Sequence, residues 1–395
     1  MVSVAEASQI IQSVKVKVNK VSIPVEQVTG RVLAERIFAD RDLPPFNRVA
    51  MDGIAINSKS FKAQQQFKLE NIQPAGAPQT ELQQPEACIE VMTGAVLPGG
   101  TDAVIRYEDV VIRNGYATIQ LREVAAGMNI HKQGSDAKKE DILLEPGQVL
   151  SPAEISLLAS VGKTQVTVFD FPLTAIISSG DELVDISVLP EPHQIRRSNI
   201  YAVQAAMMEL GWRGDGYHLH DNKEMMKDKL RELLAHYDIL ILSGGVSKGK
   251  FDFIPEVLNS LGIEKLFHQV SQKPGKPFWF GKSAEGKIVF ALPGNPVSTF
   301  LCFYRYVKPW MLMTMDVVVK KSQAILSADV TFKPSLTYFL QVSLRNDNGR
   351  LMADPTPGGG SGDFANLKNV DGFIELPAER NVFKAGEVFD FYAFR

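Results

Sequence analysis

The chain has 395 residues, which at about 100 to 200 residues per domain predicts between two and four domains. Its 42 Lys and Arg residues nearly balance 45 Asp and Glu residues, and the formal net charge of −3 argues against nonspecific nucleic-acid binding and a polybasic membrane anchor. Apolar residues make up 45% and charged residues 22% of the chain. These are ordinary globular values, which exclude wholesale disorder and a fibrous repeat.

The N-terminal segment predicts a capped helix and no secretion signal. Ser3 and Glu6 have the spacing of a capping box, and apolar residues then recur at helical intervals. No basic stretch precedes an apolar run, and the most apolar stretch, around 310–319, is much shorter than the roughly 20 residues of a membrane span. The two cysteines, Cys88 and Cys302, have no metal-binding spacing. We therefore expect a cytoplasmic protein that contacts neither membrane nor nucleic acid.

After the N-terminal helix, the pattern of turn residues and apolar runs changes from helical to β-type. Pro44-Pro45 cannot continue a helix, and Asp52-Gly53 is a turn signal between apolar runs. As far as about Ile130, short β-rich runs alternate with Gly and Pro turns. Helical spacing returns at 151–162. That return predicts an inserted small β domain, with the segments before and after it packing together.

From about residue 171 to 315, short apolar runs alternate with helical stretches. The runs LTAIISS, GYHLH, DILILS and IVFAL are typical of buried parallel strands. This alternation predicts an open, mostly parallel α/β sheet, in which ligands bind beyond the carboxyl ends of the strands. After Ala324 only strand-like runs remain, with Asn348-Gly349 at a hairpin turn, so the C-terminal part is expected to be a second small β domain.

The loop that follows DILILS is suited to an anion. Gly244 and Gly245 are expected to leave backbone N–H groups accessible, and Ser247 adds a hydroxyl. Lys248 and Lys250 add positive charge. A phosphate or similar oxyanion fits this chemistry, although the spacing is not that of a Walker A motif and a tight strand–helix turn is the alternative.

Two further features favour an anion near the same strand ends. The run Pro293-Gly294-Asn295-Pro296 follows IVFAL and opens a helix, whose N-terminal amides and dipole attract negative charge. Lys273 and Lys276 lie around the turn in KPGKP and can bind an oxyanion as point charges. An ordinary helix start and exposed turn lysines are the alternatives.

Several acidic residues lie in predicted turns or at element ends, where an Asp is often only a cap or turn residue. If they converge on an anionic ligand, a divalent cation must lie between like charges, and Mg²⁺ commonly joins carboxylates to phosphates. Ordinary strand placement is favoured over a transition-metal site for His218 and His220, because no third ligand stands nearby. The acidic candidates are Asp52, Asp136, Asp181, Glu182, Asp221 and Asp252.

An ordered set of motifs spans essentially the whole chain. These are PPFNRVAMDGIAI, MTGAVLPGGTDAVIRYED, ISSGDELVD, ILSGGVSKGKFDFIPEVL, KPGKPFWFGK and ALPGNPVSTF. In this order and at these distances, the motifs resemble the molybdopterin molybdenumtransferase family, called MoeA in bacteria and represented by the E domain of gephyrin in animals. The resemblance implies an elongated helical domain, an inserted β domain, an α/β domain that binds molybdopterin, and a C-terminal β-barrel. Together with the patterns, it predicts domains at 1–40 plus 137–168, 41–136, 169–318 and 319–395.

The resemblance also implies an activity. The reaction is insertion of molybdate into adenylylated molybdopterin, with release of AMP and help from Mg²⁺. A homodimer with its active site at the subunit boundary is implied, as is contact with the adenylylating enzyme of the pathway. The alternatives are a molybdopterin adenylyltransferase, because related folds share the SGGxSxG loop, and a non-catalytic scaffold with the same fold. The family's functional acidic and hydroxyl positions fall on Asp52, Thr93, Asp136, Glu182, Asp221 and Asp252.

The family resemblance divides these positions by role. Glu182, Asp221 and Asp252 are expected to organise metal and water, whereas Asp52, Thr93 and Asp136 act from the inserted domain, expected to be that of the other subunit. Thr93, Ser247, Lys273 and Lys276 are expected to contact the pterin-phosphate or oxyanion side of the substrate. The ligand-binding positions are expected to be Gly244, Gly245, Ser247, Lys273, Lys276, Pro293, Gly294, Asn295 and Pro296.

The chain departs from the family pattern at several positions. Arg48 and Val49 precede the Ala of AMDG, and Ile54 follows its Gly. His131 and Gln269 stand where the family often has an arginine and a lysine. These two exchanges imply that one positive charge is pH-dependent and another is lost near the anion site.

Overall fold

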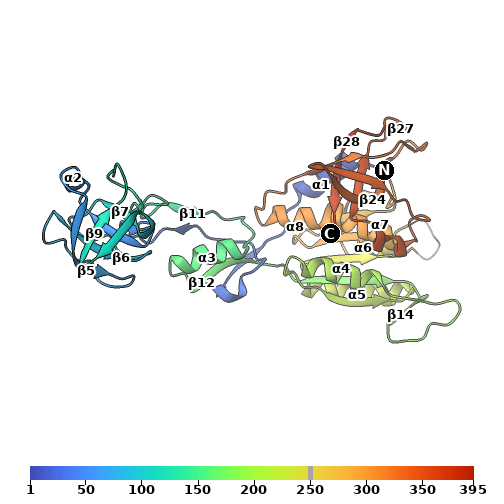
Figure 1. The fold of residues 1–395 in the computed structure, drawn as a ribbon. Coiled ribbons are helices and arrows are strands. Elements are labelled where there is room, and N and C mark those ends of the chain that lie inside the picture. The colour runs from blue at the N-terminus through green and yellow to red at the C-terminus, as the bar shows by residue number, and fades with distance from the viewer. Residues whose placement is uncertain (248–251) are drawn as a thin grey trace. The chain divides into compact units, whose positions relative to one another are not determined.

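The computed structural model describes residues 1–247 and 252–395. The described chain divides into two compact units, whose elements are labelled in Figure 1. Unit 1 comprises Met1–Ala34, Pro146–Pro152 and Gln165–Arg395, and unit 2 comprises Glu35–Glu145 and Ala153–Thr164. Unit 2 is therefore inserted into the sequence of unit 1.

Unit 2 is built on a six-stranded sheet with the order β7-β4-β6-β5-β9-β8. Two-stranded pairs are formed by β3 with β10 and by β2 with β11. Apolar residues of the sheet are buried in the core of this unit, which agrees with the expected small β domain. The elements are β2 (Ile37–Phe38), β3 (Arg48–Val49), β4 (Gly53–Ile56), α2 (Ser58–Phe61), β5 (Gln66–Gln73), β6 (Ala87–Val91), β7 (Ala103–Arg106), η2 (Tyr107–Asp109), β8 (Val110–Arg113), β9 (Tyr116–Ile119), β10 (Ile130–His131), β11 (Ile142–Leu144) and α3 (Pro152–Ser160).

The α/β part of unit 1 contains a second six-stranded sheet, with the order β16-β13-β17-β21-β20-β18. The first four strands are mutually parallel, and β20 and β18 complete the sheet antiparallel to their neighbours. The predicted mostly parallel sheet is confirmed. Its strands are β13 (Thr174–Ser179), β16 (Asp215–Leu219), β17 (Ile239–Ser243), β18 (Glu264–His268), β20 (Trp279–Lys282) and β21 (Ile288–Leu292), and a small pair is formed by β14 (Leu183–Val184) and β15 (Ile195–Arg196).

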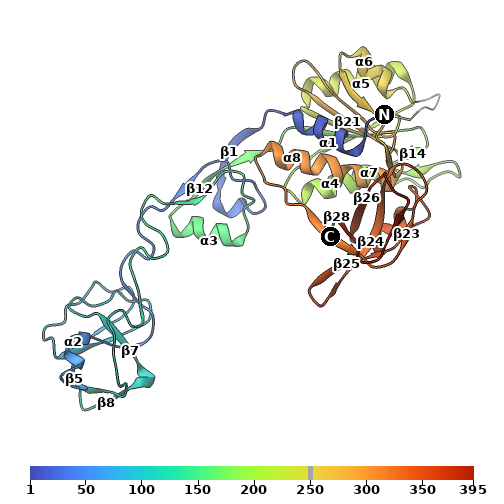
Figure 2. The same cartoon turned by 90° about the horizontal axis from the view of Figure 1, so that it is seen from above.

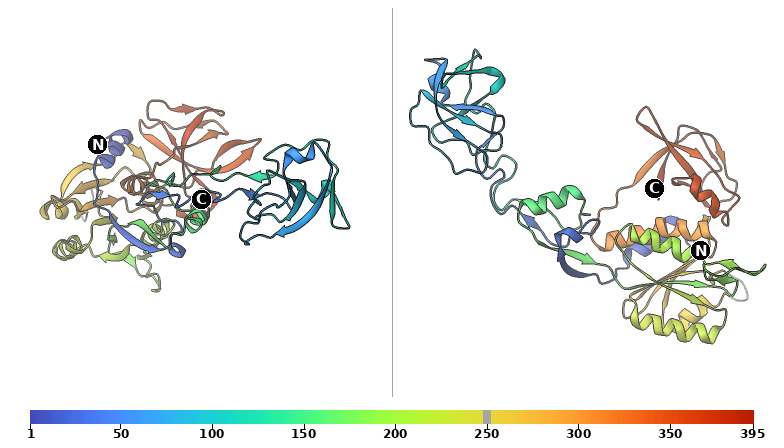
Figure 3. Two further views of the ribbon diagram at one scale, coloured as in Figure 1. Left: turned by 90° about the vertical axis from the view of Figure 1, so that its left-hand side faces the viewer. Right: turned by 60° about the horizontal axis from the view of Figure 1, so that its bottom comes forward.

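Helices cover both faces of this sheet, as the right-hand view of Figure 3 shows. Because side chains alternate along a strand, Ile176 and Ile241 pack on the face covered by α4 and α7, whereas Ile177 and Leu242 pack on the face covered by α5 and α6. Strands buried on both faces read as continuous apolar runs, as these do. The helices are α4 (Asn199–Met208), α5 (Lys223–His236), α6 (Ile254–Ser260), α7 (Pro296–Cys302) and α8 (Lys308–Thr314).

The C-terminal part of unit 1 is a closed β-barrel (Figure 2). Its strands follow the order β24-β25-β22-β28-β26, and β26 pairs back with β24. The predicted hairpin is confirmed, because Asn348 and Gly349 have φ angles of 51° and 83° between β24 and β25. A 3-10 helix, η4 (Phe364–Asn369), interrupts the expected run of strands. The strands are β19 (Gln272–Lys273), β22 (Ser322–Leu326), β23 (Val330–Thr331), β24 (Thr337–Asp347), β25 (Arg350–Pro355), β26 (Gly372–Leu376), β27 (Val382–Phe383) and β28 (Val388–Ala393).

The N-terminus of unit 1 begins with the expected capped helix. In α1 (Val4–Ser13), the Ser3 amide donates to Glu6 and the Glu6 amide donates to the Ser3 hydroxyl, which completes the capping box. A two-stranded sheet follows, formed by β1 (Asn19–Pro24) and β12 (Gln165–Asp170), with η1 (Val25–Gln27) after β1. No helix in the described parts of the chain is long and apolar enough to cross a membrane.

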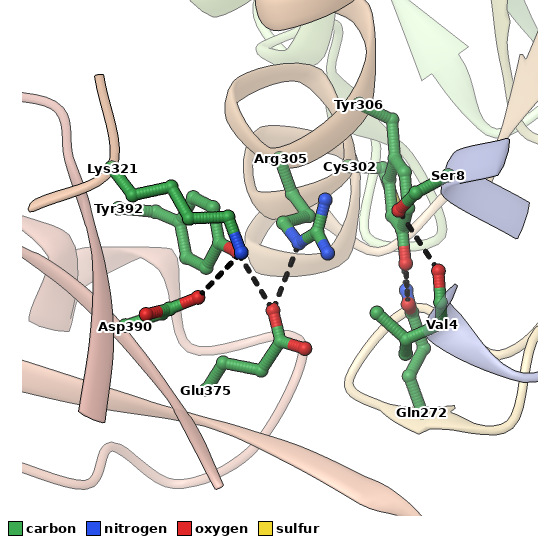
Figure 4. A network of polar contacts seen from close by, with 10 residues as sticks. All are labelled: Val4, Ser8, Gln272, Cys302, Arg305, Tyr306, Lys321, Glu375, Asp390 and Tyr392. Carbon is green, nitrogen blue, oxygen red and sulfur yellow. Dashed lines mark hydrogen bonds and ion pairs between the residues drawn. The ribbon is translucent and has the colours of Figure 1, made fainter. Parts of the chain in front are cut away.

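A buried polar network joins the helices of unit 1 to its barrel (Figure 4). Arg305, in the π-helix η3 (Phe303–Val307), donates through Nε to Glu375 Oε2 at 3.0 Å, and the Tyr392 hydroxyl donates to the same oxygen at 2.8 Å. Tyr306 donates to the Gln272 side-chain carbonyl. Since Gln272 immediately precedes KPGKP, this network anchors the lysine-bearing turn.

Candidate active site

The strand-end cavity, defined here as the space beyond the carboxyl ends of β13, β17 and β21, has a volume of about 1030 Å³. It lies where strand order reverses around β13, which is where ligands bind in open α/β sheets. Barrel residues complete its wall, among them Tyr338 and Gln341. The acidic candidate Asp181 is not among the residues that line the cavity. The other site residues that the sequence predicts in the described part of unit 1 line it: Glu182, Gly244, Gly245, Ser247, Asp221, Asp252, Lys273, Lys276, Pro293, Gly294, Asn295 and Pro296.

The glycine loop after β17 is shaped by close backbone packing. A Cβ on Gly244, whose φ is +100°, would lie 2.7 Å from the Ser179 carbonyl oxygen, and a Cβ on Gly245 would lie 2.7 Å from Ile254 Cδ1. The expectation of accessible amides is wrong for Gly244, because its N–H donates to the Leu292 carbonyl at 3.2 Å. Gly244 is therefore needed for the close approach of two strand ends, whereas Gly245 has a φ of +66°, which favours glycine. Lys248 and Lys250, predicted to add charge here, lie outside the described residues.

The loop before α7 is tied to the barrel. Asn295 Nδ2 donates to the Ser361 hydroxyl at 2.8 Å, and the Val297 amide donates to the Ser361 carbonyl. Residues 357–361, a glycine-rich stretch of the barrel, thereby form one wall of the strand-end cavity. This stretch was not predicted as part of the site, although its three consecutive glycines were a visible signal.

The lysine-bearing turn forms another wall. Buried Gln272 donates to the Gly275 carbonyl at 3.2 Å and holds the turn from inside. Lys273 lies over the Phe332 ring, with Nζ 5.6 Å from the ring centroid, and Lys276 also lines the cavity. The two ammonium groups give this wall the positive charge expected of an anion site.

The carboxylates of the site are held by the loops after β13 and β16. Asp221 and Asp181 are reciprocally bonded, since Asp181 Oδ1 accepts from the Asp221 amide at 3.2 Å and Asp221 Oδ2 accepts from the Asp181 amide at 3.4 Å. A hydrogen bond from His220 is the largest cause that lowers the pKa of Asp181. Glu182 lies beside Gly180, where a Cβ would approach Glu182 Oε2 to 2.4 Å. Asp181 therefore positions Asp221, which lines the cavity, while its own side chain bonds His220.

The carboxylate oxygens that line the cavity are of the ligand type that Mg²⁺ prefers. Glu182, Asp221 and Asp252 supply carboxylate oxygens to one cavity, and Mg²⁺ prefers oxygen ligands. Among the residues that the structure describes, no three His, Cys, Asp or Glu side chains lie close enough together to hold a metal ion. The fit is therefore to an ion held by one or two carboxylates together with ligand phosphates, the usual arrangement for Mg²⁺.

Unit 2 brings two of its predicted site residues together. Asp52 Oδ1 accepts from the Thr93 amide at 2.6 Å and from the Thr93 hydroxyl at 2.7 Å. The backbone bond first, and then the hydroxyl bond, lowers the pKa of Asp52. Gly53 follows, and a Cβ there would lie 1.9 Å from the Ile105 carbonyl oxygen. The AMDG motif thus places an ionised carboxylate next to the first position of β4, where only glycine fits.

Asp136 belongs to a separate cluster in unit 2. His131 Nε2 lies 2.7 Å from Asp136 Oδ1, and Arg48 Nη2 lies 2.9 Å from His131 Nδ1, across the β3–β10 pair. A guanidinium can only donate, so Nδ1 must accept and the ring proton must be on Nε2, from which it is donated to Asp136. This bond is the largest cause that lowers the pKa of Asp136. Arg48, one of the departures from the family pattern, thus supplies positive charge beside His131.

The tautomer of His131 provides a prediction. We expect ¹⁵N NMR at pH 8 to find His131 as the Nε2–H tautomer in the native chain, and the double variant Arg48→Met/Asp136→Ala to produce a mixture, because the donor to Nδ1 and the acceptor of the Nε2 proton are both removed. Arg113→Met, which removes an exposed arginine from β8 of the same unit, should leave the tautomer unchanged. A mixture already present in the native chain would contradict the assignment.

The other departures from the family pattern have structural explanations. Val49 and Ile54 are buried in the core of unit 2, so each of these departures changes a side chain that packs in the core. Gln269 has a φ of +75°, and its backbone bonds Val2 and Phe278. It is not among the residues that line the strand-end cavity.

Three other residues that line the cavity were not predicted from the sequence. Asn199 follows β15 and begins α4, where it reads as an ordinary first helical residue. Arg197 lines the cavity and is paired with Asp185. Ser243 ends β17 and appears only as the last letter of an apolar run. No composition signal marks these three, because their role arises from loops that meet in space.

Family models match nearly the whole chain. Residues 2–162 match the MoeA N-terminal region (domain I and II), residues 175–312 match a probable molybdopterin binding domain, and residues 323–394 match the MoeA C-terminal region (domain IV). The three matches occur in the order in which the motifs were found.

Similar proteins cover the chain from end to end. A protein of Synechocystis sp. named molybdopterin molybdenumtransferase is 42% identical over 100% of both chains. One of the same name from Staphylococcus epidermidis is 31% identical, covering 98% of this chain and 94% of its own. Two crystal structures of the molybdopterin biosynthesis MoeA protein from Pyrococcus horikoshii match with TM-scores of 0.83 and 0.86, at 31% and 27% identity, and cover 100% of this chain and 99% and 100% of theirs.

Proposed function

Because the chain belongs to the molybdopterin molybdenumtransferase (MoeA) family, we propose that it inserts molybdate into adenylylated molybdopterin with release of AMP. The chain is accordingly a transferase of molybdenum cofactor biosynthesis. The observation that carries the finer proposal is the strand-end cavity. There, two lysines and three carboxylates from separate parts of the sequence line one space beside glycine-rich loops.

Substrate binding follows from the cavity's size and charge. A volume of about 1030 Å³ is at the upper end of ligand sites, as a substrate with a pterin, a pyrophosphate and an adenosine requires. Lys273, Lys276 and the Ser247 hydroxyl favour phosphate or molybdate oxygens in this proposal. The backbone of residues 293–296 approaches the substrate closely, as a loop with glycine allows.

One or two of the carboxylates of Glu182, Asp221 and Asp252 would hold Mg²⁺ together with the substrate's phosphates. When bound, the ion polarises phosphoryl oxygens and neutralises the charge that develops as the pyrophosphate bond breaks. Asp181 and His220 keep Asp221 oriented through the bonds described above.

A homodimer is part of this proposal. Asp52, Thr93 and Asp136 lie in unit 2, and all other predicted site residues lie in unit 1. We propose that unit 2 of one subunit supplies these three residues to the strand-end cavity of its partner. A cytoplasmic location and contact with the adenylylating enzyme of the pathway belong to the same proposal, and the two buried free thiols, Cys88 and Cys302, accord with a reducing compartment.

Product formation separates this proposal from its alternatives. The native chain, given adenylylated molybdopterin, molybdate and Mg²⁺, should form molybdenum cofactor that activates a cofactor-free molybdoenzyme. Given ATP and molybdopterin, it should form no adenylylated product. Adenylylation would support the adenylyltransferase alternative, and inactivity in both assays would support a non-catalytic scaffold.

A further inference from the structure

Asn199 contacts a strand end, a loop and a helix around the strand-end cavity. Its Nδ2 lies 2.8 Å from the Ser243 hydroxyl at the end of β17, 2.8 Å from the Gly294 carbonyl after β21, and 3.1 Å from the Thr299 hydroxyl in α7. Thr299 in turn donates to the Pro293 carbonyl at 2.5 Å. The side chain that begins α4 thereby fixes the ends of two neighbouring strands.

These contacts determine which way the amide faces. The Gly294 carbonyl can only accept, so the Asn199 atom beside it must be the NH₂ group. A planar amide then places Oδ1 on the opposite side from these partners. Asn199 lines the strand-end cavity, and no residue within 1–247 or 252–395 donates a hydrogen bond to its Oδ1.

We propose that Asn199 is a specificity-determining residue, whose Oδ1 accepts a hydrogen bond from a ring amine of the bound substrate. The inference rests on the proposed function, in which the substrate carries two heteroaromatic rings with exocyclic amines, a pterin and an adenine. The two N–H donors of Nδ2, which have three oxygen neighbours, hold the Oδ1 acceptor in one orientation before the substrate binds. This limits the entropy lost when Oδ1 meets its donor.

The test pairs variants with ligands that differ only in the ring amine. Isothermal titration measures binding of pterin against 4-oxopteridine, which lacks the amine, and of AMP against purine riboside 5′-monophosphate. One neutral hydrogen bond contributes about 3- to 10-fold in affinity, so the native chain should prefer the aminated member of one pair by that factor. Asn199→Ala should reduce this preference to about one. The pair that responds identifies the ring.

Gln204→Ala is the matched control. Gln204 lies on the same helix and donates through its amide to the Gly214 carbonyl at 2.9 Å, away from the cavity. It should retain the native preference. A purely structural role for Asn199 would weaken both members of each pair equally and would overturn the inference, even if all four ligands bind. Failure of the native chain to bind either aminated ligand would overturn the proposed function as well.

Discussion

Glu182→Gln and Asp252→Asn should each lower Mg²⁺-dependent turnover by about 100-fold while leaving the protein folded. Both side chains line the strand-end cavity, and each substitution keeps the shape of the side chain while removing its charge. The amide is a weaker ligand for a hard cation, so the Mg²⁺ concentration at half-maximal activity should rise together with the loss of kcat. Steady-state kinetics over a Mg²⁺ titration measures both effects.

Glu191→Gln is the control for this result. Glu191 is exposed on the connection between β14 and β15, close in sequence to Glu182, and does not line the cavity. It should have native kinetics and a native melting temperature. Native activity in Glu182→Gln or Asp252→Asn would remove that carboxylate from the metal site. A large fall in melting temperature would instead show a structural role.

Mixing two inactive variants should restore activity if the site is shared between subunits. Asp52→Asn damages unit 2 and Asp252→Asn damages unit 1, so a mixed dimer has one intact site and one site with both changes. Random exchange makes half of the dimers mixed, and activity should return to roughly a quarter of the native value. Each variant alone should be nearly inactive. The measurement is molybdenum cofactor formation after co-refolding of differently tagged chains.

A second mixture provides the control. Asp252→Asn and Glu182→Gln both damage unit 1, so their mixed dimers contain no intact site and should remain inactive. Mixed dimers of Asp52→Asn with Asp252→Asn that are isolated through both tags and still show no activity would contradict a shared site.

Much of the fold could be predicted because local pattern and tertiary burial agree. The apolar runs of β13, β17 and β21 are buried on both faces of the sheet, so their continuous apolar sequence was enough to predict parallel strands. Asn348-Gly349 has the chemistry of a two-residue hairpin, and the structure forms that hairpin. The carboxyl ends of these strands then indicated where Gly244, Pro293 and Glu182 would meet.

The remaining site features depend on contacts between distant segments. Asn199 reads as an ordinary helix start, and its role appears only when Gly294 and Thr299 are placed beside it. Arg48 looked like a simple departure from a motif until the β3–β10 pair placed it across from His131. Glycine 244 was expected to expose its amide, but the Leu292 carbonyl takes that hydrogen bond. Register and loop proximity, which no single segment encodes, decided all three.

Release of AMP from adenylylated molybdopterin, measured with and without molybdate, tests the central claim most directly. The purified native chain with Mg²⁺ should release AMP and form molybdenum cofactor when molybdate is present, with one AMP for each cofactor formed. Without molybdate, no molybdenum cofactor should form. Absence of AMP release and of cofactor formation with molybdate present, from a folded protein that binds the substrate, would contradict the assignment of molybdate insertion to this cavity.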